Sequence, residues 1–220
     1  MKRLFWVIIL ILFLTKICFA ETVTIEDGYQ GAKWSMSPEK VKRILIEKKI
    51  KLKEHQISKY QLPDGSYTKN DTSNLTVYYK DQIKGETIEI QFQFFKRKLW
   101  AAGIFYEDEF YTGYENTGAE SFSQYILELL IEKYGEPYDD YASDLGFSKD
   151  KICLWYSDTT TMQFKKEVYI RNPDEKFNEG KCWISVTYNS KKLAYEKQKY
   201  EEKLKQQMDR EQREEVKKKL

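Results

Sequence analysis

Residues 87–95 read TIEIQFQFF and decide the fold class, because polar and apolar side chains alternate along them from Thr87 to Phe94. Alternation with a period of two predicts a β-strand with one buried face and one wet face. The run Lys96-Arg97-Lys98 then predicts a turn into a second strand over 99–106. A strand that is wet on one side favours an antiparallel meander over a buried parallel sheet.

Helix signals stand before and after this hairpin. Ser37, Pro38 and Glu39 supply an N-cap, a first-turn proline and an early acid, so a helix is predicted over 38–49. A second helix is predicted over 120–134, because Gly135 and Pro137 stop it.

The remaining pattern predicts further strands and one loop. The strands are expected at 57–62, 75–80, 151–156, 160–170 and 181–188, and a loop at 69–73. The predicted order is a helix and a three-strand meander, repeated twice. The expected fold is therefore α+β, an antiparallel sheet packed by two helices, and the repeat leaves open a duplicated unit.

The first twenty residues have the order of a cleavable signal peptide. Lys2 and Arg3 precede an apolar run over 5–14, and Cys18-Phe19-Ala20 places small residues where signal peptidase cuts. We expect cleavage near Ala20 and export to the periplasm or the medium. The alternative is an uncleaved N-terminal membrane anchor, which the short apolar run disfavours.

Charge divides the mature chain into a body, 21–189, and a tail, 190–220. Removing three basic residues and no acidic one takes the formal net charge from +2 to −1. The tail has eleven basic and seven acidic residues, so the body is near −5. A mildly acidic body gives no reason to expect nucleic-acid binding.

The tail itself is predicted to be a solvated helix. From 191 to 219 it lacks proline and glycine, and opposite charges recur four residues apart, as in Glu201 with Lys205. It is interpreted as a solubilising extension, a spacer or a docking helix. The basic run 217–219 allows weak contact with anionic lipid.

The mature chain has two cysteines, Cys153 and Cys182. An even pair in an exported chain favours a disulfide, whereas two separate buried thiols are the alternative.

The known catalytic and cofactor motifs are missing from the sequence. His55 is the single histidine and lies in a polar stretch, where a solvated role is expected. There is no nucleophile elbow, phosphate-binding loop or dinucleotide fingerprint. We therefore assign no catalytic, cofactor-binding or metal-ligating residue.

Two clusters of acidic and aromatic residues flank the second predicted helix. The expected partner contacts are Tyr106, Asp108, Glu109, Tyr111, Tyr114, Tyr138, Asp139, Asp140 and Tyr141. Such loops, around 106–115 and 138–144, could instead hold calcium or a glycan, or provide paired carboxylates for an enzyme. The enzyme hypothesis requires the two clusters to lie close together.

Two short motifs carry a resemblance. Trp34 followed by Ser35-Met36-Ser37-Pro38-Glu39, and the run 129–137 with its Tyr134-Gly135-Glu136-Pro137 ending, resemble those of uncharacterised exported bacterial proteins. The element order also resembles the β-lactamase-inhibitor fold and the small outer-membrane-assembly lipoproteins. This resemblance implies a non-catalytic protein-binding or scaffold module of the cell envelope, with an envelope or secreted protein as its partner. The sequence lacks the lipobox of the lipoproteins.

Overall fold

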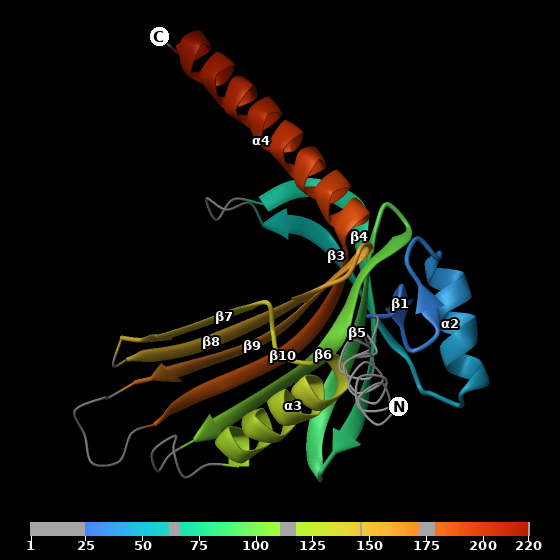
Figure 1. Ribbon diagram of the computed structural model, residues 1–220. Coiled ribbons are helices and arrows are strands. Elements are labelled where there is room, and N and C mark those ends of the chain that lie inside the picture. The colour runs from blue at the N-terminus through green and yellow to red at the C-terminus, as the bar shows by residue number, and fades with distance from the viewer. Residues whose placement is uncertain (1–24, 62–66, 111–117, 146, 172–178, 220) are drawn as a thin grey trace, which may run out of the picture.

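A computed structural model of the chain describes residues 25–61, 67–110, 118–145, 147–171 and 179–219. The chain folds into two small strands, an eight-stranded sheet and three helices within these residues (Figure 1). In chain order the elements are β1 (Gly28–Tyr29), β2 (Ala32–Lys33), α2 (Pro38–Glu47), β3 (Lys53–Gln61), β4 (Tyr67–Ile83), β5 (Glu86–Phe95), β6 (Lys98–Phe110), α3 (Gly118–Tyr134), β7 (Asp139–Asp144), β8 (Ser148–Tyr156), β9 (Thr160–Ile170), β10 (Gly180–Ser190) and α4 (Lys191–Lys219).

The large sheet is antiparallel throughout, in the order β3-β4-β5-β6-β10-β9-β8-β7. Two four-stranded meanders meet where β6 pairs with β10. The predicted α+β fold, with a helix and a three-strand meander repeated twice, is therefore wrong. The described chain is mostly β, each meander has four strands, and the strands form one continuous sheet.

The junction of the two meanders depends on a glycine. A Cβ atom at Gly103 of β6 would lie 2.3 Å from the carbonyl oxygen of Val186 on β10. Real Cβ atoms do not approach an oxygen so closely, so any other residue here would push the two strands apart. Only glycine allows this close approach of the two central strands.

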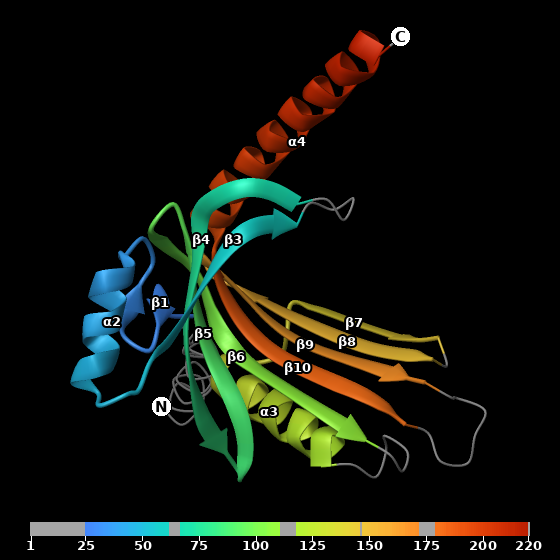
Figure 2. The same ribbon diagram turned by 180° about the vertical axis from the view of Figure 1, so that it is seen from behind.

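One face of the sheet, which we call the covered face, forms the core. A row of side chains runs across it in register and is buried throughout: Val77, Phe92, Ala102, Tyr188, Met162 and Trp155. Helix α3 lies along β6, and the β1–β2 ribbon lies between α2 and the sheet (Figures 1 and 2). The Tyr29 ring of the ribbon packs 5.0 Å from Tyr188 and 5.9 Å from Phe92, centroid to centroid.

The predicted turn between β5 and β6 is confirmed. Lys96 and Arg97 have φ angles of 48° and 59°, and Phe95 pairs with Lys98. Two consecutive left-handed residues make the tight hairpin turn whose twist matches that of the strands. The Arg97 guanidinium then pairs with Glu39 of α2 at 2.5 Å.

The predicted C-terminal helix is present as α4. It begins directly after β10, where the Leu193 amide donates to the Ser190 hydroxyl at 3.4 Å. Its first turns rest on the β5–β6 hairpin, with the Tyr200 and Phe95 rings 5.4 Å apart and the Lys197 ammonium 4.9 Å from the Trp100 ring. The C-terminal part of α4 runs away from β7, β8, β9 and β10 (Figure 1).

The other local predictions hold in part. Both predicted helices are present, and strands occupy the five predicted strand regions. The predicted loop at 69–73 is wrong, because β4 runs through it, and β7 was not predicted. Within the described residues, no helix is both long and apolar enough to cross a membrane. The predicted signal peptide, 1–20, lies outside the described residues.

Candidate functional site

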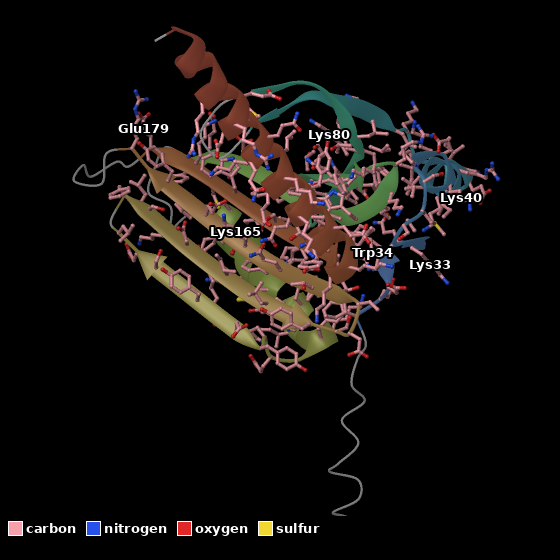
Figure 3. All side chains as sticks on the ribbon, turned by 90° about the horizontal axis from the view of Figure 1, so that it is seen from above. Lys33, Trp34, Lys40, Lys80, Lys165 and Glu179 are labelled. Carbon is pink, nitrogen blue, oxygen red and sulfur yellow. The ribbon has the colours of Figure 1, made fainter. Side chains whose placement is uncertain are left out.

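On the second face of the large sheet, which we call the open face, none of the described helices packs along β9, β8 and β7 (Figures 1 and 2). One register row on it contains polar and aromatic side chains and a single aliphatic one: Lys80, Glu89, Phe105, Ser185, Lys165, Ile152 and Tyr141. Figure 3 views the molecule from the α4 side, with Lys80 and Lys165 of this row labelled. The open face thus carries charged, hydroxyl and aromatic side chains, whereas the covered face carries the buried side chains of the core.

A groove of about 640 Å³ is hollowed into the open face. Its lining comes from five adjacent strands, β4, β5, β6, β10 and β9, and includes Lys80, Glu89, Phe105, Glu107, Glu167 and Trp183. Trp183 is 37% exposed, and Phe105 is half-buried. Side chains from five strands line one hollow because the sheet is curved there. The groove is a candidate binding site, because it is concave and presents aromatic side chains, which are enriched at recognition surfaces.

Hydrogen bonds and ion pairs hold the groove's carboxylates in place. The Gln91 amide donates to Glu89 at 2.8 Å, and Lys165 pairs with Glu167 at 2.7 Å. Lys181 pairs with both Glu107 and Glu109, at 3.3 and 2.7 Å. Its hydrogen bonds to these two carboxylates raise the pKa of Lys181 above its usual value. A pre-ordered acidic surface of this kind loses little side-chain entropy on binding.

The described residues of the first acidic cluster, Tyr106, Asp108 and Glu109, lie within strand β6, where a loop had been predicted. Tyr106 is buried, with its ring 4.6 Å from Phe122 and its hydroxyl 3.4 Å from Glu86. Burial chiefly, followed by the negative charges of Asp108 and Glu86, raises the pKa of Tyr106. Tyr106 is thus a core residue. Asp108 lies on the same face and Glu109 on the open face, while Tyr111 and Tyr114 lie outside the described residues.

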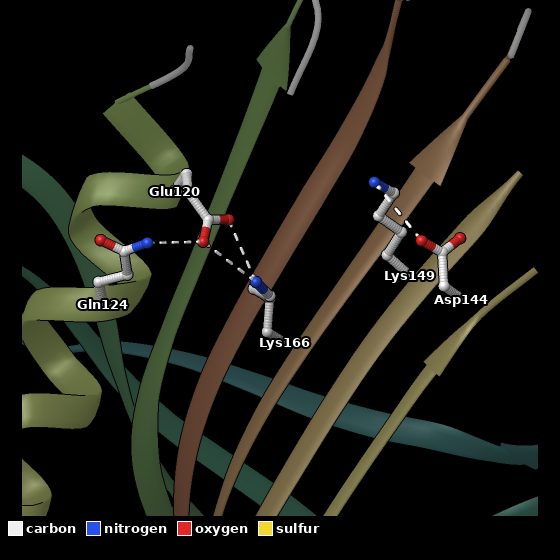
Figure 4. Close-up of polar contacts among 5 residues, drawn as sticks. All are labelled: Glu120, Gln124, Asp144, Lys149 and Lys166. Carbon is white, nitrogen blue, oxygen red and sulfur yellow. Dashed lines mark hydrogen bonds and ion pairs between the residues drawn. The ribbon is translucent and has the colours of Figure 1, made fainter. Parts of the chain in front are cut away.

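The second acidic cluster forms the edge strand β7. Tyr138 and Tyr141 are 75% and 60% exposed. Asp139 accepts a hydrogen bond from the Tyr156 hydroxyl at 2.9 Å, and Asp140 pairs with Lys151 at 3.0 Å. Asp144 pairs with Lys149 at 3.6 Å (Figure 4). The four residues predicted here as partner contacts, Tyr138, Asp139, Asp140 and Tyr141, are therefore accessible side chains on or directly before an edge strand.

The sheet keeps the two acidic clusters apart. Strands β10, β9 and β8 lie between β6 and β7. Four strand spacings amount to about 19 Å, whereas paired catalytic carboxylates stand about 5 to 10 Å apart. The carboxylate-enzyme hypothesis therefore lacks the convergence that it requires.

Metal chemistry has no visible basis in the described part of the chain. There, no group of three or more His, Cys, Asp or Glu residues is arranged to hold a metal ion. His55 lies in strand β3. The calcium hypothesis thus gains no ligand cluster from these residues.

Both cysteines are buried and carry free thiols in the structure, so the predicted disulfide is not formed there. Cys153 on β8 stands opposite Phe164, and Cys182 on β10 stands opposite Val168, four residues further along β9. The offset of four residues along the strands, combined with the two strand spacings from β8 to β10, separates the two Cα atoms by about 16 Å. This distance is too long for a disulfide. Burial chiefly, and then the charge of Asp140, raises the pKa of the Cys153 thiol to about 11.

A polar contact on the covered face joins α3 to the sheet. Lys166 of β9 pairs with Glu120 of α3 at 3.1 Å, and Gln124 donates to the same carboxylate at 3.1 Å (Figure 4). Both charged side chains are mostly buried, at 16% and 22% exposed. This cluster fixes the start of α3 against β9 and is structural.

Sequence reasoning identified the wet positions Glu89 and Gln91 but missed the groove. Trp183 and Phe105 occupy outward positions between buried neighbours, such as Cys182 and Ile184 around Trp183. A large aromatic residue at an outward strand position is the signal that could have located this surface.

No protein-family model, curated protein or solved structure matches the chain. The resemblance to exported inhibitor-like and assembly-lipoprotein modules therefore stays a prediction.

Proposed function

We propose that the mature chain is an exported, non-catalytic protein-binding module that holds a partner protein in the groove of its open face. The observation that carries this proposal is the groove itself, about 640 Å³ of concave surface with Trp183 at its side. Tryptophan is enriched among the residues that contribute most to binding at protein interfaces.

The lining indicates the chemistry of the partner. Three carboxylates, Glu89, Glu107 and Glu167, surround the aromatic surface of Phe105 and Trp183. A lysine or arginine beside an apolar side chain satisfies both features, because cations bind carboxylates and stack on aromatic rings. The partner segment is thus expected to be basic and partly apolar.

Export determines where that partner resides. The N-terminal pattern of charge, apolar run and small residues supports cleavage near Ala20, so the partner is an envelope or secreted protein. Intact mass of the protein recovered from cell envelopes tests this step. A mass that begins at Glu21 supports export, and a full-length membrane-bound chain contradicts it.

In-cell crosslinking followed by pull-down and mass spectrometry tests the binding function. Three tagged forms are compared: the natural sequence, Trp183→Ala in the groove and Tyr195→Ala on α4. Tyr195 is the matched control, because it is an aromatic side chain, 58% exposed, that lies outside the groove lining.

The proposal expects one exported protein to be captured by the natural form and by Tyr195→Ala, and to be lost with Trp183→Ala. Circular dichroism of the purified variants verifies that both are folded. Equal capture by all three forms would contradict a groove-bound partner.

A further inference from the structure

Exposed apolar side chains gather at one end of the sheet, away from the groove. Of the ten large hydrophobic side chains exposed in the described part of the chain, five lie on or beside the β7–β8 hairpin. They are Tyr138 (75% exposed), Tyr141 (60%), Leu145 (63%), Phe147 (53%) and Tyr156 (36%). The Tyr138 and Tyr156 rings lie 5.9 Å apart. A concentration of this kind in so short a segment marks an interaction surface.

The same hairpin contains the edge of the sheet. Strand β7 pairs with β8 on one side and is the last strand in the order. The Leu145 amide donates to the Ser148 carbonyl at 2.9 Å, which makes 145 and 148 a hydrogen-bonded pair. Because such pairs alternate along an antiparallel ladder, residues 140, 142 and 144 direct their backbone N–H and C=O groups away from β8. These outward groups form a template for a further strand.

The charge of β7 indicates which strand would fit. Three of its six residues are aspartates, and none is basic. Asp140 and Asp144 lie on the covered-face side of the strand, where they pair with Lys151 and Lys149 of β8. A second copy of β7 would bring aspartates against aspartates, and like charges on neighbouring strands are destabilising. A basic strand would instead share these carboxylates.

We propose that β7 is a docking edge for an extended, basic strand of another protein, which joins the sheet as a ninth strand. Backbone groups of residues 140, 142 and 144 bind the incoming main chain. Its basic side chains meet Asp140 and Asp144 on one face, and its apolar side chains pack on Tyr141 on the other. This edge is distinct from the groove, so the inference stands independently of the proposed function.

A synthetic peptide tests the edge. The probe is a capped seven-residue peptide that alternates lysine and valine, and its control alternates glutamate and valine. Amide hydrogen exchange of the ¹⁵N-labelled mature chain is followed by NMR. At ten times the Kd of the lysine peptide, exchange of the amides of Asp140, Ala142 and Asp144 slows about tenfold, and the glutamate peptide has no such effect.

Two variants make the test specific. Ala142→Pro removes an outward N–H while leaving the β7–β8 hydrogen bonds, so it abolishes the protection; an unchanged exchange rate at Ile152, on β8, verifies that the hairpin is intact. The double change Asp140→Asn with Asp144→Asn keeps the backbone and weakens lysine-peptide binding about fivefold. The inference is overturned if the lysine peptide protects none of the three amides, or if both peptides protect them equally.

Discussion

Two tryptophans on opposite faces of the same sheet differ in burial and in the role that each has. Trp155 on β8 is 1% exposed, and its indole N–H donates to the Gly135 carbonyl at 2.8 Å. Trp183 on β10 is 37% exposed and lines the groove. The same residue type thus holds a helix end on the covered face and offers contact area on the open face.

The difference follows from what lies against each face. The ribbon and α3 exclude water from the covered face, so every apolar atom there contributes to stability. Along β9, β8 and β7 the open face meets solvent, and its aromatic side chains contribute little to folding. They remain available for binding, which is why stability and recognition can be changed separately in this fold.

Replacing each tryptophan separates the two faces most strongly. Trp155→Ala is expected to lower the free energy of unfolding by about 3 to 5 kcal/mol, because it opens a cavity and leaves the Gly135 carbonyl without its donor. Trp183→Ala is expected to cost less than about 1 kcal/mol, since its side chain is partly in water. Urea denaturation followed by circular dichroism measures both.

An equal loss of unfolding free energy in the two tryptophan variants would contradict the difference between the two faces. It would mean that the open face is covered in solution, for example by a second copy of the chain. Unfolding at several protein concentrations distinguishes that case, because a dimer's midpoint shifts with concentration.

Two lysines allow a mostly buried ion pair to be compared with a more exposed one. Lys166→Ala is expected to cost about 2 kcal/mol, because it leaves Glu120 mostly buried without its cation. Lys151→Ala is expected to cost about 0.5 kcal/mol, because Asp140 is 48% exposed. Urea denaturation at low and high salt checks this, and a salt-dependent loss as large for Lys151 as for Lys166 would contradict it.

The sequence predicts well the features that local periodicity controls. The alternation over 87–95 predicted β5, the cap at Ser37-Pro38-Glu39 predicted α2, and the uninterrupted charged run predicted α4. In each of these elements, the order of polar and apolar residues along the segment itself shows which side chains are buried and which are exposed. The wet positions of β5 could also be identified.

Features that depend on long-range pairing could not be predicted. Strand β7 has solvent on both faces and therefore lacks alternation, so its aspartates were placed in a loop. The pairing of β6 with β10 joins residues seventy or more positions apart, and it alone makes one sheet of two meanders. The groove requires that pairing, since Phe105 and Trp183 lie on those two strands.

Alkaline pH tests the burial of a tyrosine on the covered face. Burial chiefly, and then the hydrogen bond with the Tyr134 hydroxyl at 3.3 Å, raises the pKa of Tyr188. Tyrosine in the unfolded chain ionises near pH 10, so the stabilisation is complete below that pH and is lost above it. By pH 11 this one residue is expected to cost about 1.4 kcal/mol.

Urea unfolding of the natural chain and of Tyr188→Phe between pH 8 and pH 11 measures this effect. The variant lacks the ionisable hydroxyl, so its stability should fall less over this range, by that same amount. Parallel pH profiles for the two proteins would show that the Tyr188 hydroxyl is accessible to solvent. They would contradict the burial of Tyr188 in the core.

The smallest expected effect concerns the two thiols, which both belong to the covered face. A disulfide between Cys153 and Cys182 would close a loop of about thirty residues and add about 3 to 4 kcal/mol. The register holds the two sulfur atoms apart, so adding a reductant to the mature chain should leave the free energy of unfolding unchanged.

In the folded protein, burial and the pKa of about 11 should also keep the Cys153 thiol unreactive toward alkylating reagents at pH 8. Both thiols should react once the chain is unfolded in urea without reductant. A loss of several kcal/mol on reduction would require β8 and β10 to approach each other, and with it a different order of strands at the centre of the sheet.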